Sequence, residues 1–217
     1  MIINSKKSFY TLLLFTGVCL YACNDNNSKE PGKTTGDSLK PAVKKEVAKL
    51  PETKYERPPI VNIVDTLTPK MTVIYAKDSA ASFERIGQKL ANIYGVTLAT
   101  YIKKNNLKTT GFPMAWYTKA KAPYFFEAGI PVNKTGAKAV AGVQTREIGA
   151  GKAVIAHFFG PFELLPQGYD AIKDWIKDNK KTVAGPSYEI YLTDPIDKNG
   201  KPVDPYKIQT DIVFPIK

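Results

Sequence analysis

The chain has 217 residues, and its 31 lysines and arginines outnumber its 20 aspartates and glutamates, giving a formal net charge of +11. It contains two cysteines and one histidine, which excludes a disulfide-rich scaffold and a metal site built from several thiolates or imidazoles. Because the basic residues are spread along the sequence and form no block, we expect a solvated surface facing anionic lipid or polysaccharide, and no nucleic-acid partner.

The N-terminus has the pattern of a secretory signal. Lys6 and Lys7 precede an apolar run, 9–20, that is too short for a membrane-spanning helix. The run leads into the letters LYAC, which resemble the lipobox of bacterial lipoproteins and end at Cys23. We therefore predict a signal peptide over 1–22 and a lipid on Cys23, which would place the protein in the cell envelope as a periplasmic or outer-membrane lipoprotein. The alternative is an ordinary secretory signal followed by an incidental cysteine.

Residues 23–57 have the composition of a flexible tether. Prolines, glycines, lysines and glutamates recur there, and large apolar side chains are scarce. Such a segment cannot bury enough surface to offset the entropy it would lose on ordering. From residue 58 to 217 about 160 residues remain, which is enough for one domain with a single core.

The first half of this domain predicts the order strand, helix, strand, strand. The letters MTVIYAK (71–77) are typical of a strand. The next run places one apolar stripe on a helix through Phe83, Ile86, Leu90 and Ile93. Gly95 interrupts this helix before it continues over 98–104. Two further strands follow over 111–119 and 123–132.

The second half repeats that order. A strand over 152–159 ends at Gly160-Pro161, because proline fixes its own φ and supplies no amide donor. The helix after it has an apolar stripe formed by Leu165, Tyr169, Ile172 and Ile176. Strands over 185–193 and 205–216 complete the repeat. We therefore predict an α+β fold of two pseudo-symmetric β-α-β-β units, about 70–132 and 150–217, each an antiparallel sheet covered on one side by its helix.

Three stretches of the second half, 157–179, 185–195 and 205–216, are similar in order and spacing to the gyrase-inhibitor-like (GyrI-like) effector-binding domain, a drug-sensing module of some bacterial transcription activators. The first half matches more loosely, through AGIPV at 128–132. The resemblance implies two β-α-β-β units that form a central groove lined by aromatic side chains and an acidic residue. It also implies a small amphipathic or cationic ligand, and some members resemble hydrolases of cyclopropane-containing toxins.

The resemblance assigns the groove carboxylate to Glu189, in the letters SYEIY. Side chains alternate along a strand, so Tyr191 shares a face with Glu189. The corresponding strand of the first unit has Ala115 and Tyr117 at the matching positions, so the acid would be present on one side only. Glu127 is either a second groove acid or an exposed strand residue, and the second interpretation is favoured.

The strands carry more aromatic side chains than two helices can cover, so some must face solvent, the partner unit or a ligand. His157 has three interpretations: a structural histidine, a polar contact in the groove, or a heme ligand. The first is favoured, and we expect no cofactor and no metal. Ligand-binding candidates in addition to Glu189 and Tyr191 are Trp116, Tyr117, Phe125, Phe158 and His157.

Three functions are compatible with these residues. In the first, the domain binds a small molecule without catalysis, and Glu189 selects a cation. In the second, Glu189 and Tyr191 act as general acid and base in the hydrolysis of a strained, cyclopropanoid substrate. In the third, the domain is a non-catalytic adaptor in the envelope. The sequence has no Ser-His-Asp order and no free thiol for nucleophilic catalysis, so binding is favoured over hydrolysis.

Overall fold

The computed structural model describes residues 57–119 and 121–217. The predicted signal peptide, Cys23 and nearly all of the tether lie outside the described residues. Within the described ranges, no helix is both long enough and apolar enough to cross a membrane.

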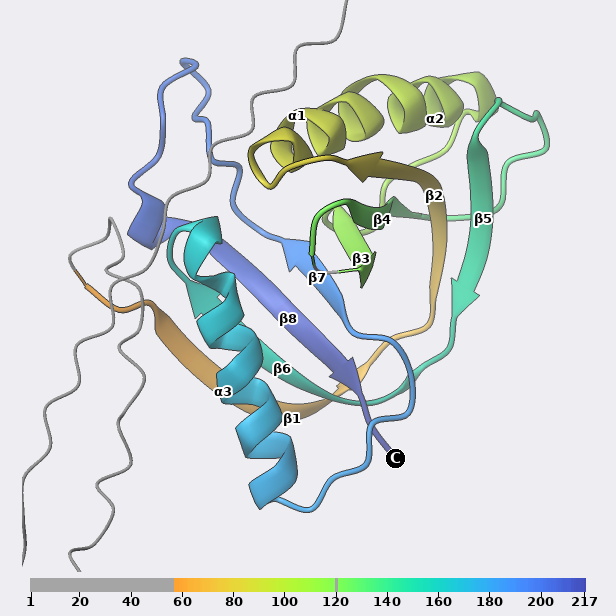
Figure 1. The fold of residues 1–217 in the computed structure, drawn as a ribbon. Helices are drawn as coiled ribbons and strands as arrows, with labels where there is room; N and C mark the ends of the chain where they lie inside the picture. The colour runs from red at the N-terminus through yellow and green to blue at the C-terminus, as the bar shows by residue number, and fades with distance from the viewer. Residues whose placement is uncertain (1–56, 120) are drawn as a thin grey trace, which may run out of the picture. The chain divides into compact units, whose positions relative to one another are not determined.

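The core of the fold is one eight-stranded sheet in which every neighbouring pair of strands is antiparallel (Figure 1). The strand order is β1-β6-β8-β7-β3-β4-β2-β5. The strands are β1 (Ile60–Thr68), β2 (Met71–Ala80), β3 (Met114–Lys119), β4 (Tyr124–Val132), β5 (Val143–Ile148), β6 (Gly151–Phe159), β7 (Tyr188–Tyr191) and β8 (Gln209–Pro215). With its helices on one face, this sheet confirms the predicted α+β class.

The strand order is symmetric about its centre, because each strand on one side has its counterpart from the other unit at the same distance on the other side. The first unit contributes β2, β3 and β4, and the second contributes β6, β7 and β8, with the β3–β7 pair at the centre. In that pair Met114 lies opposite Ile190, and Ala115 lies opposite Glu189. The two predicted sheets are therefore one continuous sheet, and Glu189 lies beside the pseudo-twofold axis.

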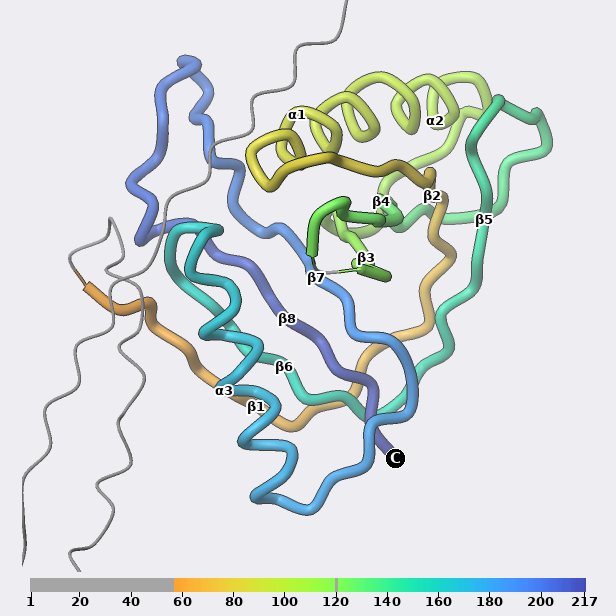
Figure 2. The backbone as a smooth tube through the Cα atoms, viewed as in Figure 1, coloured from red at the N-terminus to blue at the C-terminus, as the bar shows by residue number. Residues whose placement is uncertain are grey.

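Two strands, β1 and β5, were not predicted, and both are exchanged between the units. β1 directly precedes β2 in the chain but pairs along its whole length with β6. In the same way β5 precedes β6 but pairs with β2. Figure 2 shows both strands at the outer edges of the sheet. Each unit is thus completed by a strand that comes before the other unit in the sequence.

The helices follow the predicted pattern, and all of them cover one face of the sheet (Figure 1). The first helical segment consists of α1 (Glu84–Asn92), a π-helical stretch (Ile93–Leu98) and α2 (Ala99–Asn105), so the interruption predicted at Gly95 is a π-helical stretch. The second consists of a 3₁₀ turn (Phe162–Leu164) and α3 (Leu165–Asp178). A further 3₁₀ turn, Pro205–Lys207, precedes β8.

Three apolar clusters hold the sheet and helices together. One lies between α1–α2 and strands β2 and β4, and another lies between α3 and strands β6 and β8. The third is on the opposite face of the sheet and combines side chains from both units. It contains Val73, Met114, Trp116, Ala153, Tyr188 and Val213.

Candidate functional site

A buried carboxyl group surrounded by phenols lies at the centre of the sheet, on the face that the helices cover. Glu189 of β7 is 4% exposed. Tyr169 of α3 donates a hydrogen bond to its Oε1 (2.9 Å), and Tyr191 of β7 donates one to its Oε2 (2.8 Å). The hydroxyl oxygens of Tyr191 and Tyr117 of β3 are 3.0 Å apart. We call these four residues the Glu189 cluster; it takes side chains from both units.

Local structure explains how these residues meet. Alternation along β7 puts Glu189 and Tyr191 on one face, as predicted. The backbone N–H of Tyr191 donates to the carbonyl of Pro113, which continues the pairing of β7 with β3. Gly168 lets α3 approach the sheet closely, because a Cβ there would lie 2.8 Å from side-chain atoms of Phe158 and Ile212. This close packing brings the hydroxyl of Tyr169 to the carboxyl group.

The electrostatics of the cluster are unusual because the buried carboxyl group has no cationic partner among the described residues. Burial raises the pKa of Glu189 to about 7, although the hydrogen bonds from Tyr191 and Tyr169 act in the opposite direction. Buried charges in proteins are normally paired. Glu189 is therefore poised to exchange a proton near neutral pH.

The surrounding phenols stay neutral. Burial, and next the negative charge of Glu189, raise the pKa of Tyr117, Tyr169 and Tyr191 above that of a free phenol. Burial also raises the pKa of Tyr94, whose hydroxyl donates to the carbonyl of Met114 near the cluster. These hydroxyls consequently act as hydrogen-bond donors to the carboxylate or to a bound polar group.

A buried hydroxyl group lies beside the cluster. Thr210 of β8 lies directly across from Tyr191 in the strand pairing. Its hydroxyl is buried and makes no hydrogen bond to any described residue. Unsatisfied buried hydroxyls are rare, and each calls for an explanation such as a bound water or ligand. Thr210 therefore offers a polar group that a molecule placed next to Tyr191 can use.

Comparison with known proteins agrees with this architecture. The sequence model of a family described as the GyrI-like small molecule binding domain matches residues 69–217. The chain belongs to the GyrI-like family. The fold is similar to that of the EcmrR C-terminal domain, with a TM-score of 0.61 and 19% identity over 73% of this chain and 98% of that one. No curated protein matches the sequence.

Two further solved structures share the GyrI-like fold. EcmrR in its complex with DNA gives a TM-score of 0.62 at 19% identity, and the match covers 72% of this chain but only 57% of EcmrR. A hydrolase from Listeria innocua gives 0.51 at 11% identity over 71% of this chain and 91% of that one. At such identities the structures show the fold alone. Residues 69–217 thus form a GyrI-like small-molecule-binding domain.

The GyrI-like domain brings together three of the predicted site residues, Glu189, Tyr191 and Tyr117, and places the other four elsewhere. Trp116 packs on the opposite face of the sheet, with its ring centroid 5.6 Å from that of Tyr188. Phe125 is 46% exposed, whereas Phe158 is fully buried beneath α3. These positions follow from alternation and from the distance of β4 and β6 from β7 in the sheet.

His157 also lies outside the cluster. Its Nδ1 is 2.8 Å from Oδ1 of the buried Asp211, on the sheet face opposite Phe158. Gln209 donates a second hydrogen bond to the same oxygen (3.1 Å). No group of three or more metal-ligating side chains occurs within the described ranges. His157 is thus paired with Asp211 on the face away from the Glu189 cluster.

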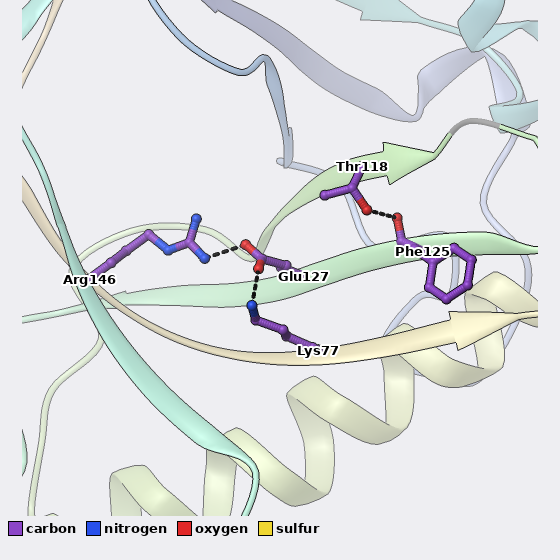
Figure 3. Close-up of polar contacts among 5 residues, drawn as sticks. All are labelled: Lys77, Thr118, Phe125, Glu127 and Arg146. Carbon is purple, nitrogen blue, oxygen red and sulfur yellow. Dashed lines mark hydrogen bonds and ion pairs between the residues drawn. The ribbon is translucent and has the colours of Figure 1, made fainter.

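Glu127 is not the exposed strand residue that we favoured. Its side chain is 14% exposed and forms ion pairs with Arg146 and with Lys77 (3.1 Å), as Figure 3 shows. Arg146 in turn stacks on the rings of Tyr75 and Trp116. Because these partners lie on the face opposite the helices, Glu127 takes no part in the Glu189 cluster.

Sequence reasoning missed two members of the site. Tyr169 was assigned to the apolar stripe of its helix, where it does pack, in edge-to-face contact with Phe214. A phenol in the middle of such a stripe is a signal, because a buried hydroxyl needs a partner. Thr210 could have been found in the same way, as a hydroxyl on the covered face of β8.

Proposed function

We propose that this protein binds a cationic, amphipathic small molecule at Glu189, and that it does so while anchored in the cell envelope by a lipid on Cys23. The observation that carries the binding proposal is a buried carboxyl group without a cation among the described residues. A ligand cation would supply the missing charge. The anchoring rests on the N-terminal sequence pattern, which lies outside the described residues.

Release of the Glu189 proton explains how a cation would bind. With a pKa of about 7, Glu189 is partly protonated at neutral pH in the unliganded protein. An approaching cation favours the carboxylate and drives the proton off, so the ion pair forms where water is excluded and electrostatic attraction is strong. The tyrosine rings add cation–π attraction and apolar surface for the rest of the ligand.

Entry of a ligand requires side chains to move, because Glu189 is covered. The phenols that cover it, Tyr117, Tyr169 and Tyr191, are each half-buried and so reach the protein surface. Phe162, in the turn before α3, packs edge-on against Tyr191 with ring centroids 6.1 Å apart. Rotation of these rings would expose the carboxyl group together with the hydroxyl of Thr210, which has no hydrogen-bond partner in the described ranges.

The test compares a cation with a neutral molecule of the same shape. Benzyltrimethylammonium and its neutral analogue neopentylbenzene are titrated calorimetrically into the wild type, Glu189→Gln and Glu127→Gln. Glu189→Gln keeps the shape of the side chain and removes its charge. It should therefore weaken binding of the cation by about 1–3 kcal/mol and leave binding of the neutral molecule unchanged. Glu127→Gln, which removes a carboxylate on the other face, should change neither. Equal losses for both ligands in Glu189→Gln would rule out charge selection.

Hydrolysis of a cyclopropane-bearing substrate is the second candidate function. It is favoured by one observation, the chain of hydrogen bonds from Glu189 through Tyr191 to Tyr117. A carboxyl group with a pKa near 7 can both give and accept a proton at neutral pH, and the phenols offer a path for that proton. Turnover by the wild type that is lost in Tyr191→Phe, with ligand affinity retained, would establish this activity.

A further inference from the structure

The first unit contains a long stretch of sequence that is almost free of acids. Residues 86–146 include eight lysines and one arginine but a single carboxylate, Glu127. Most of these lysines are far apart in the chain. Whether these lysines lie close together in space depends on the fold.

Five of the lysines meet at the C-terminal end of α2. There the helix end lies against the loop between β4 and β5, because the backbone N–H of Lys138 donates to Oδ1 of Asn105 (2.6 Å) and that of Lys108 donates to Oδ1 of Asn133 (2.9 Å). All five side chains are exposed. We call this group the lysine patch; it consists of Lys103, Lys104, Lys108, Lys134 and Lys138.

No carboxylate among the described residues forms an ion pair with the patch. Glu127 is held by Lys77 and Arg146 (Figure 3). Glu147, the next acid in the chain, pairs with Lys70 at 3.0 Å. The charge of the patch is therefore available to an outside partner.

Helix stability accounts for only part of this arrangement. Lysines in the last turn of a helix interact favourably with its C-terminal carbonyl groups, which explains Lys103 and Lys104. Lys134 and Lys138 lie in a loop, where that effect is absent. Five like charges in one place repel each other, and an anionic partner would relieve that repulsion.

The neighbouring helix surface indicates what kind of anion fits. Residues 90–102 carry no charge at all. Their outward side includes Ala91, Gly95, Ala99 and Val96, the last of which is 58% exposed. An uncharged surface beside clustered lysines suits a bilayer interface, where apolar atoms meet the headgroup region and lysines meet phosphates. Recognition of nucleic-acid phosphates more often uses the fork geometry of arginine, which the patch does not contain.

We propose that the lysine patch docks on an anionic lipid bilayer, with the outward side of residues 90–102 facing the headgroups. The inference does not depend on the proposed ligand or on the lipid at Cys23. Each lysine near an anionic membrane contributes on the order of 1 kcal/mol, so removing three of the five charges should lower partitioning roughly 100-fold, and added salt should weaken it.

The experiment measures co-sedimentation of the full chain carrying Cys23→Ser, so that no acyl group contributes. The vesicles are pure phosphatidylcholine, or phosphatidylcholine and phosphatidylglycerol in equal parts. The patch variant changes Lys103, Lys134 and Lys138 to Gln. The matched control changes three exposed lysines outside the patch, Lys177, Lys198 and Lys201, to Gln and has the same net charge.

The unaltered patch should bind the anionic vesicles more tightly than the neutral ones, and the patch variant alone should lose that excess. Binding through the N-terminal apolar run is common to all three proteins and cancels in the comparison. Equal binding to both kinds of vesicle, or equal loss in the patch variant and the control, would overturn the proposal. So would a patch-dependent preference for duplex DNA over anionic vesicles at matched phosphate concentration.

Discussion

Replacing Glu189 by glutamine should change how the stability of the domain depends on pH. At acid pH the carboxyl group is protonated, and its Oε2 can donate to the hydroxyl of Tyr191, which then donates to Tyr117. The amide of the substituted glutamine can make the same bonds, so Glu189→Gln should cost less than about 1 kcal/mol there. The two proteins should diverge as the pH rises.

The magnitude follows from the pKa of Glu189, about 7 in the folded protein against 4.5 for an ordinary glutamate. Below pH 4.5 both states hold the proton, and nothing is lost. Between pH 4.5 and 7 the unfolded chain releases the proton while the folded one keeps it, so the free energy of unfolding falls by about 1.4 kcal/mol per pH unit. Above pH 7 the loss is complete, at about 3 kcal/mol. Glu189→Gln has no carboxyl group at this position and does not lose this free energy, so it should be more stable than the wild type at pH 8.

Urea unfolding followed by circular dichroism, at several pH values between 4 and 8, measures this difference. Glu127→Gln is the control, because burial acts to raise the pKa of Glu127 but the hydrogen bonds from Arg146 and Lys77 outweigh it and lower that pKa. The stabilising effect of Glu127 is present above the ordinary pKa and is lost as the pH falls. Glu127→Gln should therefore be least stable relative to wild type at neutral pH, the opposite trend. Parallel curves for wild type and Glu189→Gln would refute the reasoning about the cluster.

Two further predictions concern packing and anchoring. Gly168→Ala puts a Cβ within 2.8 Å of two core side chains and should lower the free energy of unfolding by about 1–3 kcal/mol, whereas Gly87→Ala, with nothing within 4 Å, should raise it by about 0.5–1 kcal/mol. Urea unfolding of both variants checks this, and equal effects would contradict the close approach of α3. Cys23→Ser should release a soluble form or leave an uncleaved precursor on membrane fractionation. Unchanged fractionation, with no acyl group found on the wild type by mass spectrometry, would contradict the anchor.

The strands and helices of the two units could be predicted because their signals are local. An apolar stripe such as Leu165, Tyr169 and Ile172 identifies a helix without knowledge of its partner. Of the two exchanged strands, only β5 lacks such a signal, because the letters of β1, IVNIVDTLT, are rich in β-branched residues. β5 consists mainly of polar residues and packs at an edge, and β1 pairs with β6, more than 80 residues later in the chain. The two units join into one sheet through the few residues of β3 that pair with β7. No hydrophobic periodicity in the sequence predicts this pairing.

Only those features of the site that follow from side-chain alternation or from the family resemblance could be predicted. Alternation fixed Glu189 and Tyr191 on one face, and the internal repeat placed Ala115 and Tyr117 at the corresponding positions of the first unit, but neither says which side chains of β3 lie beside the acid. The register decides this, because Ala115 lies directly opposite Glu189 and the next residue of β3 on that face is Tyr117.

The same pairing explains why the pseudo-symmetry of the fold does not extend to its charge. A glutamate in place of Ala115 would face Glu189 across two adjacent strands, and two buried carboxyl groups at that distance cannot both ionise. One acid with phenols from both units avoids the repulsion and still surrounds the carboxyl group with donors. The cluster can therefore carry one negative charge, which is why a single cationic group is the ligand feature that it would select.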